Sequence, residues 1–186
     1  GSVKPASVTF DNSATYTLAG GAIQGTTGLT KNGSGIVTLG NANTYSGTTN
    51  VNAGALQLSG GSAITDAGLI SLADSPGATL RVIGSETIGA LSGGGPSGGN
   101  VSIDAAQTLT LSSGTQTHVG AVGGAGSLDV SGAVQTLNGV VSNTGGLSVN
   151  AGRLTLAGNN TFTGATSVAA NSGIIISNAN ALGATG

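Results

Sequence analysis

The sequence predicts an all-β fold, a right-handed parallel β-helix of about nine coils of roughly 20 residues each. Three observations lead to this prediction. Apolar residues alternate with polar ones along the chain, equivalent apolar pairs recur at a constant interval, and the composition suits a thin, repetitive core. No segment shows the periodicity of a helix.

Two-residue alternation of apolar side chains is the first observation. Successive side chains of a strand point to opposite sides, so each pair places two apolar groups on one side of a strand. Clusters of Gly, Asn and Ser separate the pairs and predict turns. The pairs are Val8/Phe10, Tyr16/Leu18, Val37/Leu39, Leu56/Leu58, Leu80/Val82, Val101/Ile103, Leu109/Leu111, Leu128/Val130, Leu147/Val149, Leu154/Leu156 and Ile174/Ile176.

The spacing of these pairs is the second observation. Leu109, Leu128 and Leu147 are evenly spaced, and Val37 and Leu56 repeat the same interval. A fixed period of about 20 residues indicates a solenoid, in which each coil stacks equivalent positions on the next. A sandwich of hairpins would also alternate, but it favours large core residues, and the chain has no Trp, two Tyr and two Phe.

Composition supports the same fold and limits the function. Among 186 residues, 5% are charged, 36 are Gly and none is Cys, while aliphatic residues remain plentiful. We interpret residues 1–186 as one β-helix segment, a piece of a longer protein. Four isolated cations cannot form the basic patch that nucleic acid requires. No apolar run approaches the roughly 20 residues that cross a bilayer, so direct membrane insertion is not expected, and the N-terminus lacks the order of a signal peptide.

A longer internal repeat lies on top of the coil period. Residues 35–51 (GIVTLGNANTYSGTTNV) align without a gap with residues 152–168 (GRLTLAGNNTFTGATSV) at an offset of 117. The segment 50–60 (NVNAGALQLSG) is echoed by 148–158 (SVNAGRLTLAG). Stacked Asn and Thr side chains are expected to form hydrogen bonds at the corners of such coils.

The pattern G-x-L-T-L-x-G-x-N-T-Y/F-x-G-x-T-x-V followed by N-A-G-x-L-x-L resembles the passenger-associated transport repeat of bacterial autotransporters. The copies run over residues 28–58 and 146–176. The resemblance implies an extracellular β-helix, secreted to the bacterial cell surface. It also implies a translocator in cis, the C-terminal outer-membrane β-barrel of the parent protein. Many relatives are adhesins, aggregation factors or biofilm proteins.

Three short motifs match functional patterns by composition alone. Residues 95–99 (GPSGG) fit the G-x-S-x-G nucleophile elbow, but no helix follows and His118 is the only histidine. Residues 93–98 fit G-x-G-x-x-G without the strand–loop–helix unit that dinucleotide binding needs. Residues 123–127 begin a calcium-binding nonapeptide, but Leu128 stands where Asp is required. We assign no catalytic, cofactor-binding or metal-binding residue and expect residues 95–99 to form a flexible, protruding loop.

The acids and aromatic residues have structural interpretations. A turn or capping role is expected for each of the six acids, although Asp104 and Asp129 could approach each other across a longer coil. Asp104 is interpreted as following an inward-pointing pattern at a strand end. His118 is predicted at an exposed corner. Tyr45 and Phe162 occupy equivalent repeat positions and are expected to fill the corners of their coils rather than to stack on sugars.

The leading functional hypothesis is a non-catalytic structural and adhesive rod, a stiff spacer whose polar flank contacts host cells, glycans or other copies. One alternative is a glycan-cleaving enzyme on a β-helix, which requires clustered acids. Another is a self-assembling fibre subunit. Ice binding is a further hypothesis, suggested by the Thr-x-Thr pairs at 15/17, 108/110 and 115/117.

Overall fold

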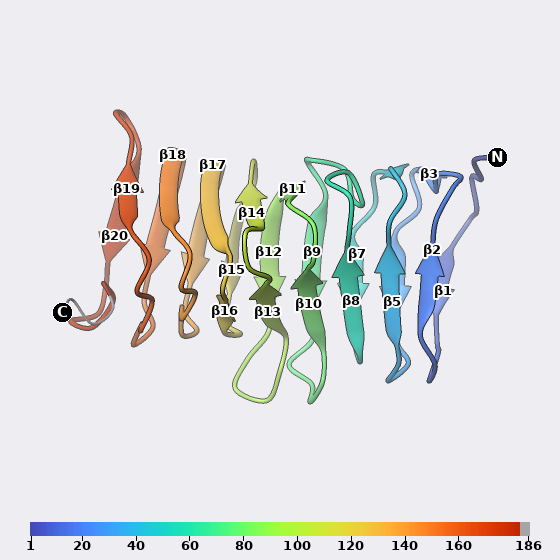
Figure 1. Cartoon of the computed structure of the whole chain (residues 1–186), viewed down its shortest axis with the longest axis horizontal. Helices are drawn as coiled ribbons and strands as arrows, with labels where there is room; N and C mark the ends of the chain where they lie inside the picture. Colours follow the sequence, from blue (N-terminus) through green and yellow to red (C-terminus); the bar gives the residue numbers. More distant parts are fainter. Residues whose placement is uncertain (183–186) are drawn as a thin grey trace.

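The computed structural model describes residues 1–182, and these form parallel strands stacked into a β-solenoid of about eight turns without a helix. The chain enters at one end of the rod and leaves at the other, so that sequence order follows the rod axis (Figure 1). The predicted all-β, parallel solenoid is therefore confirmed.

Each turn of the chain visits three faces in the order 1, 2 and 3. Face 1 contains β2 (Tyr16–Leu18), β5 (Ile36–Leu39), β8 (Ala55–Leu58), β10 (Thr79–Val82), β13 (Asn100–Ile103) and β16 (Val122–Gly124). Face 2 contains β3 (Gln24–Gly25), β6 (Thr44–Tyr45), β11 (Glu86–Ile88), β14 (Thr108–Leu111), the first parts of β17 (Ser127–Leu137) and β18 (Leu147–Leu156), and β19 (Thr166–Val168). Face 3 contains β1 (Val8–Phe10), β4 (Leu29–Lys31), β7 (Thr49–Val51), β9 (Leu69–Leu72), β12 (Ala90–Gly93), β15 (Thr115–His118), the second parts of β17 and β18, and β20 (Gly173–Ile176).

The register between strands follows the spacing seen in the sequence. Leu109 pairs with Leu128, and Leu128 pairs with Leu147, so the interval between these leucines is one coil. Val37 and Leu56 pair in the same way on face 1. These stacked side chains are fully buried or nearly so and form the predicted aliphatic ladders.

Some coils are longer than predicted, which explains why about eight turns fill the chain rather than about nine. The steps from Leu56 to Leu80 and from Gly93 to His118 are each several residues longer than the step from Val37 to Leu56. The additional residues form the loops before β10 and β13, which extend beyond the turns of the other coils (Figure 1). Insertions of this kind leave the stacked strands in place because they occur at a corner.

Side-chain amides connect the coils at the two corners that match each other in the long repeat. Asn43 Oδ1 accepts a hydrogen bond from the Ile23 N–H at 2.9 Å, and its Nδ2 donates to the Ala63 carbonyl at 2.8 Å, so that one side chain connects three coils. Asn160, the matching residue of the second repeat, accepts from Val141 N–H at 2.8 Å and donates to the Ala181 carbonyl at 2.7 Å. The expected polar pairing at the corners is therefore present.

The two copies of the long repeat occupy different faces of the rod. In the first copy, Val37 and Leu39 lie on face 1. The matching Leu154 and Leu156 of the second copy lie on face 3. The offset between the copies thus corresponds to five turns plus two faces, and the second copy is rotated by one face about the rod axis. Each copy of the repeat therefore consists of a corner of the rod and the strands on both sides of it. The sequence alone did not predict that the second copy is rotated.

Candidate interaction surface

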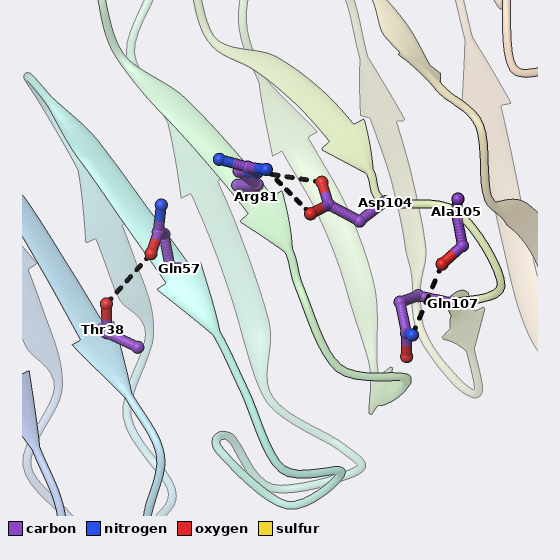
Figure 2. Close-up of polar contacts among 6 residues, drawn as sticks. All are labelled: Thr38, Gln57, Arg81, Asp104, Ala105 and Gln107. Carbon is purple, nitrogen blue, oxygen red and sulfur yellow. Dashed lines mark hydrogen bonds and ion pairs between the residues drawn. The ribbon is translucent and has the colours of Figure 1, made fainter.

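The outer side of face 1 carries polar side chains that pair across neighbouring coils. Thr38 Oγ1 donates to Gln57 Oε1 at 3.0 Å. Arg81 forms a bidentate ion pair with Asp104, with distances of 2.9 Å from Nε and 2.8 Å from Nη2 (Figure 2). The hydrogen bond from Arg81 lowers the pKa of Asp104 below its ordinary value. The donors and acceptors of this face are therefore largely used within the chain.

Face 2 contains a second internally paired cluster, centred on Asp129. Its carboxylate accepts hydrogen bonds from the hydroxyls of Ser131 and Ser148 and from the amide of Asn150, each at 2.7 Å. Asp104 binds Arg81 instead, so the two acids considered as a catalytic pair have different partners. Asp104 lies directly after the inward-pointing Val101 and Ile103 at the end of β13, as the sequence indicates, and its carboxylate faces outward to Arg81.

Two other acids cap backbone groups, as predicted. Glu86 is almost fully buried, and its carboxylate accepts from the N–H groups of Ala63 at 3.1 Å and Ile64 at 2.9 Å. Burial raises the pKa of Glu86, and these two hydrogen bonds oppose the shift. Asp74 Oδ1 accepts from the N–H groups of Ser97 and Gly98 at 2.7 and 3.1 Å. Among the residues that the structure describes, no three His, Cys, Asp or Glu side chains come together as a metal site.

The loop that matches the nucleophile elbow is tied to the preceding coil. Ser97 is exposed in this protruding loop, and the Asp74 carboxylate binds its backbone N–H. A Cβ at Gly98 would clash with the backbone carbonyl oxygen of Ser75, so glycine is needed where the two loops meet. His118 lies inside the rod, and neither ring nitrogen has a hydrogen-bond partner. The structure therefore does not connect Ser97 and His118 through a hydrogen bond.

His118 is fully buried, and its predicted exposed position is wrong. In β15, Thr115 and Thr117 point outward while His118 takes an inward position next to Gly93 and Leu137. Burial lowers the pKa of His118 to about 4, and the backbone groups of Ser92 and Gly93 oppose the shift. An imidazole that stays neutral in the interior acts as a space-filling side chain of the ladder.

Face 3 also buries polar side chains that the sequence did not single out. Lys31 is fully buried and donates hydrogen bonds to the carbonyls of Gly33 and Ala53. Burial lowers the pKa of Lys31, while Asp11 opposes the shift. Gln135 inserts its amide between coils and binds both the N–H and the carbonyl of Leu91, at 3.2 and 3.0 Å. The side chains of Lys31 and Gln135 thus bind backbone groups in place of main-chain partners. The alternation of apolar and polar residues in the sequence does not indicate which polar side chains do this.

The two repeat aromatics are structural, as expected. Tyr45 is fully buried and Phe162 is 4% exposed, so neither offers a surface to a sugar ring. The Tyr45 hydroxyl forms a hydrogen bond of 2.7 Å with Thr49 Oγ1. Burial raises the pKa of Tyr45 to about 12.

The Thr-x-Thr pairs do not form a common plane. Thr17 lies on face 1, Thr108 and Thr110 lie on face 2, and Thr115 and Thr117 lie on face 3. Because ice binding needs such pairs aligned on one face at successive coils, the structure contradicts the arrangement that this hypothesis requires.

One row of polar side chains runs along the outer side of face 3. The row follows the strand register from coil to coil, and all its members are half-buried or exposed. It consists of Thr9, Thr30, Asn50, Ser71, Ser92, Thr117, Thr136 and Thr155. No charged side chain interrupts it. We call it the face 3 row.

Comparisons with known proteins bear on this surface. The passenger-associated-transport-repeat family model matches residues 29–58 and 150–170. The chain is 40% identical over 124 residues, 64% of its length, to the Adhesin BmaC autotransporter of Brucella suis biovar 1 (strain 1330). It spans about 4% of the length of that curated relative. No solved structure gives a significant match. No helix in the described part of the chain is long and apolar enough to cross a membrane.

The matched segments lie within the two repeat copies that the sequence indicated. The family match and the similarity to an autotransporter adhesin also confirm the expected location, secreted to the bacterial cell surface. Residues 29–58 and 150–170 are therefore similar to the passenger-associated transport repeat, and the resemblance to an autotransporter passenger sequence is confirmed.

Proposed function

We propose that the chain is a non-catalytic segment of a stiff, adhesive rod that projects from the bacterial surface. The observation that carries the proposal is the ladder of face 3, which connects β1 to β20 through every intervening coil. Each coil is hydrogen-bonded to its neighbours along its backbone. An array of this kind resists bending because every coil must move with the next.

The outer surface supports a role in contact as well as in spacing. Its faces are polar and weakly charged, with one ion pair among the described residues. The similar protein of Brucella suis is named an adhesin. We infer that this chain contributes to adhesion through its flank, with a host cell, a glycan or another copy as the partner. A translocator of the same parent protein in the outer membrane would deliver it.

The glycan-cleaving alternative lacks support from the geometry. Two carboxylates that cleave a glycosidic bond face each other at roughly 5–10 Å across the sugar. Asp104 and Asp129 are occupied by different partners on different faces. Release of reducing sugar from soluble polysaccharides by the purified chain would favour the enzyme and overturn the non-catalytic proposal.

The adhesive proposal is tested with the full chain attached to inert fluorescent beads. We expect these beads to bind cultured host cells or to cluster with one another, whereas beads that carry the heat-unfolded chain should do neither. Sedimentation velocity over a wide concentration range should show a stable, folded rod. If beads that carry the folded chain bind neither cells nor each other, the chain acts only as a spacer and the proposed adhesive role is wrong.

A further inference from the structure

We propose that the face 3 row is a binding track for a neutral, extended polysaccharide that lies along the rod axis. The proposal rests on the adhesive function proposed above and assigns that function a surface and a ligand class. The corresponding outward rows of face 1 and face 2 contain Arg81 and Asp129, whereas the face 3 row has no charged member.

The first argument is geometric. Parallel strands are about 4.8 Å apart, so the row offers one polar side chain per coil along about 34 Å. An extended chain of β-linked pyranose rings advances by nearly one strand spacing for each sugar. A chain that lies along the axis would therefore meet successive Thr, Ser or Asn side chains with successive sugars.

The second argument is that the side chains of the row are free. In the described structure, the only side-chain hydrogen bond made by a member is a long one, 3.4 Å from Ser92 Oγ to the Ile70 carbonyl. On face 1, by contrast, Thr38 binds Gln57 (Figure 2). On face 2, Ser148 binds Asp129. The hydroxyls of face 3 thus retain donors and acceptors for a ligand.

The third argument concerns charge. The row has no charged member, and Lys31 of the same face points into the rod. Arg153, beside the row in β18, is the exposed cation of this face. An anionic polysaccharide would find almost no counter-charge here, so charge complementarity favours a neutral chain of hydroxyl-bearing sugars.

The dimensions of the strip favour a thin ligand over a second copy of the protein. Strands of three or four residues are about 13 Å wide, which gives a strip of roughly 450 Å². Two such strips would bury about 900 Å², below the range of roughly 1,200–2,000 Å² for stable protein interfaces. A polysaccharide needs no wider contact than the strip provides.

The test titrates the full chain with cellobiose through cellohexaose and with hydroxyethyl cellulose, using methyl NMR shifts of threonine and affinity electrophoresis. We expect affinity to rise with oligosaccharide length and the shifts to lie on face 3. A variant with Thr30→Val, Thr117→Val, Thr136→Val and Thr155→Val removes four hydroxyls and keeps side-chain shape. It should bind at least ten-fold more weakly.

A matched variant carries Thr17→Val, Thr38→Val, Thr87→Val and Thr110→Val on faces 1 and 2 and should bind as the wild type does. The proposal is overturned if both variants lose the same amount of glycan affinity, or if the wild-type chain binds no neutral glycan. Self-association in sedimentation velocity that only the face 3 variant abolishes, without glycan binding, assigns the row to a second copy instead. If beads that carry the chain bind cells but the titrations show no glycan binding, the proposed binding track is wrong and the adhesive function stands.

Discussion

His118 is an imidazole in a column of face 3 that otherwise contains Leu72, Gly93, Leu137 and Leu156. It follows the alternation of β15 and stacks between Gly93 and Leu137. Both ring nitrogens are buried without a partner. A buried polar group without a hydrogen bond costs free energy, and here that cost also depends on pH.

The position predicts an acid-sensitive contribution to stability. The pKa of His118 falls from 6.5 to about 4 on folding, so the unfolded chain takes up the proton first as pH falls. The buried, neutral imidazole therefore causes no loss of unfolding free energy above pH 6.5. As the pH falls towards 4, the unfolding free energy decreases by about 3 kcal/mol in total. We expect His118→Leu to remove this loss, measured by urea unfolding at pH 7 and pH 4.5.

The buried carboxylate of Glu86 provides an internal comparison for this prediction. Its pKa is raised by burial, so its protonation near acidic pH favours the folded state, and both proteins share this effect. The difference between wild type and His118→Leu therefore isolates the imidazole. Identical loss of unfolding free energy in the two proteins between pH 7 and pH 4.5 would contradict the prediction.

At the residue scale, alternation predicts which positions point inward but not which polar residues tolerate that position. The pattern places Leu109 and Leu111 inside, and they are fully buried. The same pattern runs through His118 and Lys31, whose polarity suggests the surface. Lys31 is buried because it meets two carbonyls at a corner, and such partners depend on the neighbouring coils.

The corner at Asn43 shows how one element is fixed to two others. The side chain satisfies a backbone N–H of the preceding coil and a backbone carbonyl of the following coil. Two main-chain groups that the strand ladders leave without partners are thereby paired in the interior. Asn41 also contacts this amide, with 2.8 Å between its Nδ2 and Asn43 Oδ1.

We predict that Asn43→Ala lowers the unfolding free energy by about 2–5 kcal/mol, because it leaves two buried backbone groups unpaired. Urea unfolding followed by circular dichroism measures the change, and faster hydrogen exchange at the Ile23 amide locates it. Asn52→Ala is the matched control, since Asn52 is exposed and pairs with Asn32. A similar cost for both variants would show that the corner has no special role.

Strand lengths follow from the sequence only in part. The apolar pair Leu128/Val130 predicts a short strand, yet β17 continues around the corner to Leu137. The backbone bends where Gly132 adopts a φ of 147°, and the register shifts between Ser131 and Val134. Glycine is an expected turn residue, but whether a turn interrupts the ladder depends on how the adjacent coil packs.

The rod as a whole predicts a deletion that should be tolerated. Removing residues 109–127 would place Leu128 where Leu109 stood, because these residues are one coil apart. We expect a folded chain with one coil fewer, and a urea m-value reduced by roughly one-eighth because m scales with the surface exposed on unfolding. Circular dichroism and urea titration measure both.

Removing residues 109–118 provides the control for that deletion. It discards about half a coil, so every following strand would meet the wrong face and the ladders could not form. The prediction is wrong if the two deletion variants have the same free energy of unfolding, or if the variant with the shorter deletion is the more stable one. The result would show whether the coil is the unit of folding.

At this scale the sequence predicted the architecture because one coil contacts only its neighbours. The constant interval alone specifies how Leu109, Leu128 and Leu147 stack. The face 3 row could not be predicted in the same way, because the coils that carry its members differ in length. Which outer face is chemically free also depends on side-chain pairs that form only after stacking.

The rotation of the second repeat has a consequence for how genes of this kind can change. Recombination between the two copies would excise five turns plus two faces, and not a whole number of turns. Because the two copies share one pattern, the second would take the place of the first at the junction and the coils could still stack, unlike after the deletion of residues 109–118. Everything distal to the junction would, however, be turned by a third of a revolution. Such an event would shorten the rod and redirect whatever its far part displays, without altering a single residue of that part.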